Sequence, residues 1–178
     1  LYYYGSTLMW PAVILNMLLP ILGIIIVSNI GSAFGVHVFP DMMIIAAVGA
    51  SVMALPMVSS TLCFLVVLAV EDMNMSGPPG LAAFVGVIIY LILRLITVRN
   101  PPQRFIGIVI TAFIATILYH GLLAFVYSLY YPEVSFGYLF IMHGWKYAIA
   151  TAIFAQPVIW LAYTLAGLFE KRQKRGII

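Results

Sequence analysis

Charge is what this sequence has least of: Asp, Glu, Lys and Arg make up 7% of its 178 residues. A soluble domain has about 25% of these residues, and they keep its surface in contact with water. Hydrophobic residues make up 65% of this chain, and its mean hydropathy is +1.15. Because such a chain cannot cover itself with a polar surface, we expect it to lie in a lipid bilayer. Its few basic residues stand at the ends of apolar runs rather than along one face, which does not indicate nucleic-acid binding.

Motifs for catalysis, phosphate binding and metal binding are also missing from the sequence. Cys63 is the single cysteine, so no disulfide can form within the chain. The histidines do not have the spacing of paired ligands on a helix and no cysteine pair exists, so we predict no metal site. The adjacent acids Glu71 and Asp72 would point about 100° apart on a helix and do not form a catalytic dyad. We therefore expect a protein that is not an enzyme and that binds no cofactor.

Long uncharged runs are what the sequence contains instead. A helix that crosses a bilayer needs about 20 mostly apolar residues. We predict an all-α polytopic membrane protein, with a single domain of six transmembrane helices at about residues 7–28, 38–55, 56–73, 81–98, 105–129 and 145–169. Connecting loops are expected at residues 29–39 and 130–144, and a few residues are expected to precede Leu1.

The uncharged stretch from Met42 to Val70 is long for one helix and short for two. Proline lacks a backbone N–H and fits best in a first helical turn, so we place a helix break at Pro56. The alternative is one tilted helix with a kink at the same proline. Pro157, inside the last predicted span, is expected to bend or loosen that helix locally.

Lysine and arginine set the orientation, because they are enriched in cytoplasmic loops. Placing the C-terminal tail in the cytoplasm puts six basic residues of the tail and of the loop before residue 105 on that side: Arg99, Arg104, Lys171, Arg172, Lys174 and Arg175. Arg94 is expected to snorkel to the same side. Lys146 then faces outward and forms an interfacial anchor with His143 and Trp145. With six spans, both termini are expected in the cytoplasm.

Ionisable residues at membrane depth are costly, and each one is a candidate for function. Glu71 and Asp72 either end a helix at the outer interface, where water reaches them, or bind a cation of a partner. His120 falls in the outer third of its predicted span. It is either satisfied by a hydrogen bond inside the bundle or faces a cavity.

Five features of the chain together resemble the rod-shape-determining MreD family. The run from Phe39 to Ile45 is similar to that family's Pro-Asp pair followed by an apolar helix. Asp72, Pro78 and Gly80 keep the spacing of an acidic helix end followed by a proline six residues on and a glycine eight residues on. A basic turn after the fourth span, Pro157 in the last span and a short basic tail extend the likeness over most of the chain.

The resemblance implies a non-enzymatic scaffold subunit in the inner membrane of a bacterium. Such a subunit belongs to the cell-wall elongation complex, which maintains rod shape through peptidoglycan synthesis. Its implied partners are MreC, the peptidoglycan synthase RodA with its transpeptidase partner, and MreB filaments. Asp72 and the loop at residues 130–144 are both expected on the outer side of the membrane. We therefore expect them near the periplasmic part of such a partner. The family often has a glutamate in the outer part of its fifth helix, where this chain has His120.

Two alternatives belong to other classes of protein. MreD-like proteins are similar in architecture to the six-helix substrate-binding subunits (S components) of ECF vitamin transporters. A subunit of that kind predicts an outward-facing pocket lined by side chains such as Asn74, Tyr127 and Trp145. An intramembrane enzyme acting on a lipid-linked substrate would need convergent acid, base or metal groups, which the sequence does not offer.

Overall fold

The computed structural model describes residues 9–34, 38–74, 78–97, 102, 105–133 and 135–174. Within these ranges every regular element is a helix and none is a strand, which confirms the predicted all-α class. The elements in chain order are α1 (Met9–Phe34), α2 (Met42–Val52), α3 (Met57–Asn74), α4 (Leu81–Thr97), α5 (Phe105–Tyr130), α6 (Phe136–Leu139), a π-helical turn η1 (Phe140–Gly144) and α7 (Trp145–Lys174).

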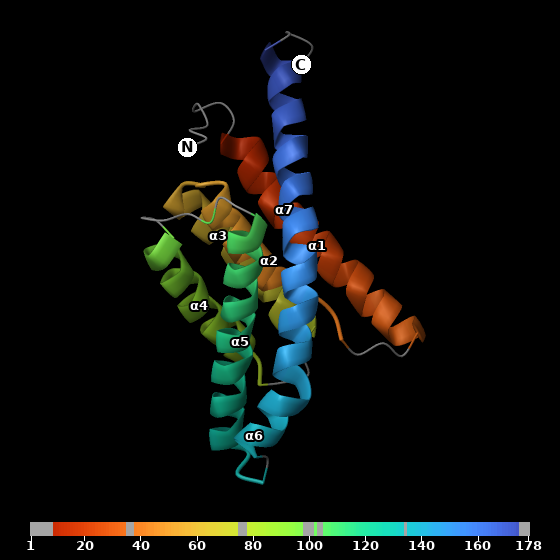
Figure 1. Ribbon diagram of the computed structural model, residues 1–178, viewed down its shortest axis with the longest axis vertical. Coiled ribbons are helices and arrows are strands. Elements are labelled where there is room, and N and C mark those ends of the chain that lie inside the picture. Colours follow the sequence, from red (N-terminus) through yellow and green to blue (C-terminus); the bar gives the residue numbers. More distant parts are fainter. Residues whose placement is uncertain are drawn as a thin grey trace.

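The helices form one bundle in which neighbours in sequence are neighbours in space. In Figure 1, α1 and α5 run downward and α4 and α7 run upward, and α1 begins at the same upper end at which α7 finishes. The short helix α2 packs against α1, α3, α4, α5 and α7. It is therefore the central element of the fold.

Helix α2 is almost completely buried, because ten of its eleven residues are buried. At about 1.5 Å of rise per residue it is about 16 Å long, roughly half the thickness of a bilayer's hydrocarbon core. Both of its ends therefore lie inside the protein. Non-helical backbone at such a depth is tolerated only where the protein itself satisfies the exposed N–H and C=O groups.

The predicted helix break at Pro56 is confirmed, since α2 ends at Val52 and α3 begins at Met57. The chain turns through Ala54, whose φ of +48° is in the left-handed region. A single kinked helix over this stretch is thereby excluded. The predicted start of α2 at residue 38 is wrong, because the helix begins only at Met42.

The prediction that Arg94 snorkels to the membrane surface is wrong. Arg94 is 6% exposed, and its Nη1 and Nη2 atoms donate hydrogen bonds of 2.8 and 2.6 Å to the carbonyl oxygens of Ala50 and Leu55. The last carbonyls of any helix lack partners within the helix. The planar guanidinium presents several N–H donors in one fork, so it binds one carbonyl in the last turn of α2 and one in the turn that follows it. Its Nε atom has no partner among the described residues.

Both predicted connecting loops are shorter than expected. Helix α1 continues to Phe34, beyond the predicted end at residue 28. Much of the predicted loop at residues 130–144 is helical, because α6 and η1 lead directly into α7. The stacked rings of Phe136 and Phe140, 5.8 Å apart, line the same apolar hollow beside α5. Helix α7 passes through Pro157 without ending and continues to Lys174, beyond the predicted span.

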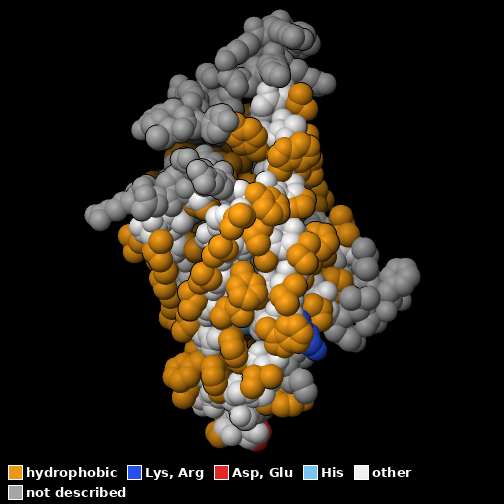
Figure 2. All heavy atoms as spheres, in the orientation of Figure 1, with side chains coloured by type: hydrophobic (Ala, Val, Ile, Leu, Met, Phe, Trp, Pro, Cys, Tyr) orange, Lys and Arg blue, Asp and Glu red, His pale blue; other side chains and the backbone are white. Residues whose placement is uncertain are grey.

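The surface has the composition of a protein that contacts lipid. Among the described residues, four helical stretches are long and apolar enough to cross a membrane: Trp10–Asn29, Met57–Asn74, Phe105–Tyr130 and Trp145–Phe169. Met42–Val52 and Leu81–Thr97 are apolar but shorter. Figure 2 shows hydrophobic side chains over most of the described surface on this face, with very few charged ones between them.

Candidate functional site

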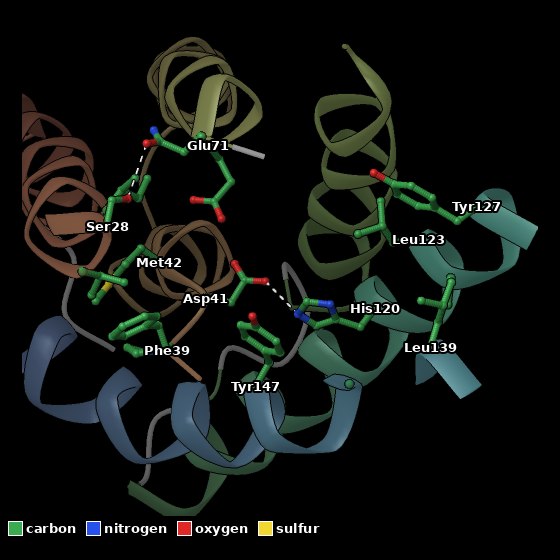
Figure 3. A pocket seen from close by; sticks show the side chains of 16 residues that line it. Ser28, Phe39, Asp41, Met42, Glu71, His120, Leu123, Tyr127, Leu139 and Tyr147 are labelled. Atoms are coloured by element: carbon green, nitrogen blue, oxygen red, sulfur yellow. Dashed lines mark hydrogen bonds and ion pairs between the residues drawn. The ribbon is translucent and has the colours of Figure 1, made fainter. Parts of the chain in front are cut away.

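A cavity of about 470 Å³ lies at the N-terminal end of α2. Its wall is formed by the second half of α1, the extended segment before α2, the last turn of α3, the C-terminal half of α5 and the start of α7. Its ionisable and aromatic side chains come from four separate segments of the chain: Phe39, Asp41, Glu71, His120, Tyr127 and Tyr147 (Figure 3). The packing of the bundle, rather than any local motif, brings these side chains together.

Asp41 fixes the start of α2 and also reaches the cavity. Asp41 is 5% exposed, and its Oδ1 accepts a hydrogen bond of 3.1 Å from the backbone N–H of Ile44. This is the N-cap interaction that satisfies one of the free donors in the first turn of a helix. The backbone N–H of Asp41 donates to Oγ1 of Thr151 at 2.7 Å, which ties the start of α2 to α7. The other carboxylate oxygen, Oδ2, faces His120 across the cavity wall.

His120 lines the cavity from α5. Its Nε2 lies 3.5 Å from Oδ2 of Asp41, a distance longer than a normal N–H···O hydrogen bond. The imidazole is held between two aromatic rings, with an edge contact of 5.1 Å to Tyr119 and a stacked contact of 4.8 Å to Tyr147. The aromatic rings therefore fix the position of the imidazole, while its Nε2 stays turned toward the carboxylate.

Glu71 occupies the last turn of α3, and its carboxylate points into the cavity toward Asp41 (Figure 3). Sequence reasoning placed Glu71 at a water-exposed helix end and treated it together with Asp72. The structure separates these two acids, because neighbours on a helix point in directions about 100° apart. Glu71 instead faces an acid that is 30 positions away in the chain, and no local pattern could have indicated that pairing.

The cavity has an excess of acidic groups. Asp41, Glu71 and His120 line it, whereas none of the described lining residues is Lys or Arg. Ionised carboxylates buried away from water are costly unless a cation, a proton or several hydrogen bonds compensate them. Within the described residues, no cluster of three or more His, Cys, Asp and Glu side chains is arranged to hold a metal ion. The cavity is thus suited to a ligand that donates hydrogen bonds or carries positive charge.

Asp72, Pro78 and Gly80, which the sequence singled out by their spacing, lie together at the start of α4. Oδ2 of Asp72 accepts a hydrogen bond of 2.7 Å from the N–H of Gly80, and Oδ1 lies 3.4 Å from the N of Ala83. Gly80 has a φ of +86°, a backbone conformation that glycine adopts at little cost. The carbonyl of Pro78 accepts from the N–H of Leu81 at 3.2 Å. Asp72 therefore acts as a cap for the free donors of α4 and takes no part in the cavity.

The remaining predicted positions lie elsewhere. Nζ of Lys146 is 5.8 Å from the centre of the Trp145 ring, a cation–π contact, and the side chain of its predicted neighbour His143 lies outside the described residues. Of the three side chains expected to line a transporter-like pocket, Tyr127 and Asn74 do line the cavity, whereas Trp145 does not. Pro157 is within α7 and is not among the lining residues.

The fold and the site together define a helical protein of membrane type with an acidic cavity at one end of its central helix. Comparisons with family models, with curated proteins and with solved structures found no match to this chain.

Proposed function

We propose that this protein is a non-enzymatic, MreD-like scaffold subunit of the bacterial cell-wall elongation complex. In this role it crosses the inner membrane with both termini in the cytoplasm and binds MreC. It thereby helps to couple MreB filaments to RodA and its transpeptidase partner, which maintains the rod shape of the cell.

One observation carries the proposal: the hydrogen bond of 2.7 Å between Oδ2 of Asp72 and the N–H of Gly80. The resemblance to MreD depends on an acid, a proline and a glycine at fixed intervals. The bond gives the interval of eight residues a physical reason, because the loop must close at that length for the acid to reach the first donors of α4. A random coincidence of residue types would not require that closure.

Six membrane segments are compatible with this proposal, although one of them is too short to cross the bilayer by itself. The four long apolar helices would cross the bilayer, and α4 (Leu81–Thr97) would do so at the lower limit of length. Helix α2 would cross only half of the bilayer, with its ends satisfied inside the bundle by Arg94 and by Thr151. Under the positive-inside rule, the cavity then opens toward the outer half of the membrane.

Depletion in a rod-shaped host combined with affinity purification tests the scaffold proposal. Cells that lose the protein should become round, and the tagged protein purified from native membranes should carry MreC. Alanine is strained at a φ of +86°. A Gly80→Ala variant should therefore restore the rod shape of depleted cells less well than the wild type and should carry less MreC. Gly167→Ala is the matched control, since a methyl group there meets no atom within 4 Å. Cells that keep their rod shape after depletion would contradict the proposal.

A second function, the S component of an ECF-type vitamin transporter, is favoured by one specific observation. The cavity of about 470 Å³ includes both Tyr127 and Asn74 in its wall, and a volume of this size accommodates a small molecule. Protein purified from native membranes would then contain a stoichiometric vitamin, detectable by mass spectrometry after denaturation. Its gene, together with those of a compatible energy-coupling module, would rescue a vitamin auxotroph.

A further inference from the structure

We propose that the cavity at the start of α2 binds a small organic cation, whose ammonium group sits between Asp41 and Glu71 and whose apolar body fills the remaining space. The scaffold function does not require such a ligand. The inference rests on the cavity itself and holds or fails independently of that proposal.

The balance of charge is the first argument. Asp41 and Glu71 come from different segments and their carboxylates point toward each other (Figure 3). A protonated His120 would compensate one of them, and none of the described lining residues is Lys or Arg. Among the described lining residues, at least one negative charge therefore stays without a counter-charge whenever both acids are ionised. Acidic groups at membrane depth are stable when a cation sits beside them.

The free hydrogen-bond acceptors are the second argument. Oδ1 of Asp41 accepts from Ile44, but Oδ2 is 3.5 Å from the nearest His120 nitrogen, too far for a strong hydrogen bond. Glu71 adds a second carboxylate that points into the same cavity. Ionised carboxylates only accept hydrogen bonds, whereas an ammonium group only donates them. The two sets of groups are chemically complementary.

The size and the lining of the cavity are the third argument. A volume of about 470 Å³ is within the range of small-molecule sites. Phe39, Tyr127 and Tyr147 contribute aromatic rings to its wall, and aromatic faces attract cations. Apolar side chains such as Ile24 and Leu123 complete the wall, so a purely hydrated inorganic ion would leave most of the cavity unfilled. The preferred ligand is therefore an amine with an apolar body.

Binding of benzylammonium to the purified full-length protein in detergent tests the proposal. Benzyl alcohol has nearly the same size and shape but no charge, so it is the matched ligand control. Isothermal titration calorimetry should show saturable binding of benzylammonium and at least about tenfold weaker binding of the alcohol, the loss expected when charge-assisted hydrogen bonds are removed.

Three variants locate the binding site. Asp41→Asn and Glu71→Gln keep the size of each side chain and should each reduce the affinity for benzylammonium at least about tenfold. Asp72→Asn changes an acid one position from Glu71 that does not line the cavity, so it should leave the affinity unchanged. Circular dichroism verifies that each variant is folded. The proposal is overturned if the amine does not bind, if the alcohol binds equally well, or if Asp72→Asn weakens binding as much as Glu71→Gln does.

Discussion

The two ends of α2 can be compared directly, because both are buried and both expose backbone groups that the helix cannot satisfy by itself. At the C-terminal end, the guanidinium of Arg94 donates to the carbonyls of Ala50 and Leu55. At the N-terminal end, Asp41 accepts from Ile44 and its own N–H donates to Thr151. The first end is closed by these contacts, whereas the second opens onto a cavity of about 470 Å³.

The difference lies in the balance of charge and not in the capping of the backbone. One cation serves two carbonyls at the C-terminal end, so both of its terminal nitrogens are used by the protein itself. At the N-terminal end, Glu71 and His120 add ionisable groups that the backbone of α2 does not need. Groups that exceed the structural requirement at a buried position indicate a role in binding. The variants below test this distinction between structural groups and binding groups. Removing a structural charge should destabilise the protein, whereas removing a binding charge should not.

The largest effect is expected for Arg94→Met, which removes the donors at the C-terminal end of α2. Two hydrogen bonds from a charged donor are then lost, at about 1.5–3 kcal/mol each, so the free energy of unfolding should fall by about 3–6 kcal/mol. The Leu55 carbonyl is left without its partner, whereas the Ala50 carbonyl keeps the N–H of Leu55 at 3.0 Å. Thermal unfolding of the purified protein in detergent, followed by circular dichroism, measures the change.

Arg94→Lys is the matched control for this prediction. Lysine keeps the charge but has no planar fork, so it can satisfy one carbonyl well and should recover about half of the lost stability. Unfolding of Arg94→Met at the wild-type temperature would refute the structural role of the guanidinium.

A smaller loss is expected for Thr151→Val at the opposite end. The fully buried Thr151 accepts the N–H of Asp41 at 2.7 Å, and valine would leave that donor without a partner in the core. The free energy of unfolding should fall by about 1–3 kcal/mol. Thr151→Ser retains the hydroxyl group and should lose much less in the same unfolding experiment. A loss of stability for serine with none for valine would assign the effect to packing of the methyl group, which valine retains.

Much of the helical framework could be predicted from the sequence, because long apolar runs bounded by polar turns determine where membrane helices begin and end. The predictions at residues 56–73, 81–98 and 105–129 agree within one residue with Met57–Asn74, Leu81–Thr97 and Phe105–Tyr130. The start of α2 could not be obtained in this way. The residues before Asp41 are as apolar as the helix itself, and hydropathy does not distinguish an extended segment from a helix.

The candidate site depends on contacts between segments that lie far apart in the sequence. In the sequence, Asp41 was considered only as part of a Pro-Asp pair, and its role as the N-cap of α2 was missed. Its proximity to Glu71 and His120 follows only from the packing of α2 against α3 and α5. Arg94 was misplaced for the same reason: a basic residue near a helix end indicates snorkelling until the adjacent buried carbonyls of Ala50 and Leu55 are known.

Glu71→Gln is expected to raise the free energy of unfolding, in contrast to Arg94→Met and Thr151→Val. In the empty protein, the Glu71 carboxylate faces that of Asp41, so an uncharged amide removes a repulsion between like charges (Figure 3). The free energy of unfolding should rise by about 1 kcal/mol at alkaline pH, where both carboxyl groups are ionised. The gain should shrink as the pH is lowered, because the wild-type carboxyl group then takes up a proton. A loss of stability at alkaline pH would show that Glu71 supports the fold as Arg94 does.

The smallest effect is expected for Asp72→Asn, which separates capping from binding. Asp41 and Asp72 both accept backbone N–H groups at the start of a helix, but only Asp41 lines the cavity. Asparagine caps helices about as well as aspartate, so Asp72→Asn should change the free energy of unfolding by less than about 0.5 kcal/mol. Asp41→Asn should also preserve the cap of α2, yet it should weaken the binding of benzylammonium. Measured side by side by thermal unfolding and calorimetry, the two variants should match in stability and differ in affinity. A large loss of stability in Asp41→Asn alone would mean that the carboxylate charge at the cavity is a structural requirement of α2, and the contrast between the two ends of the helix would disappear.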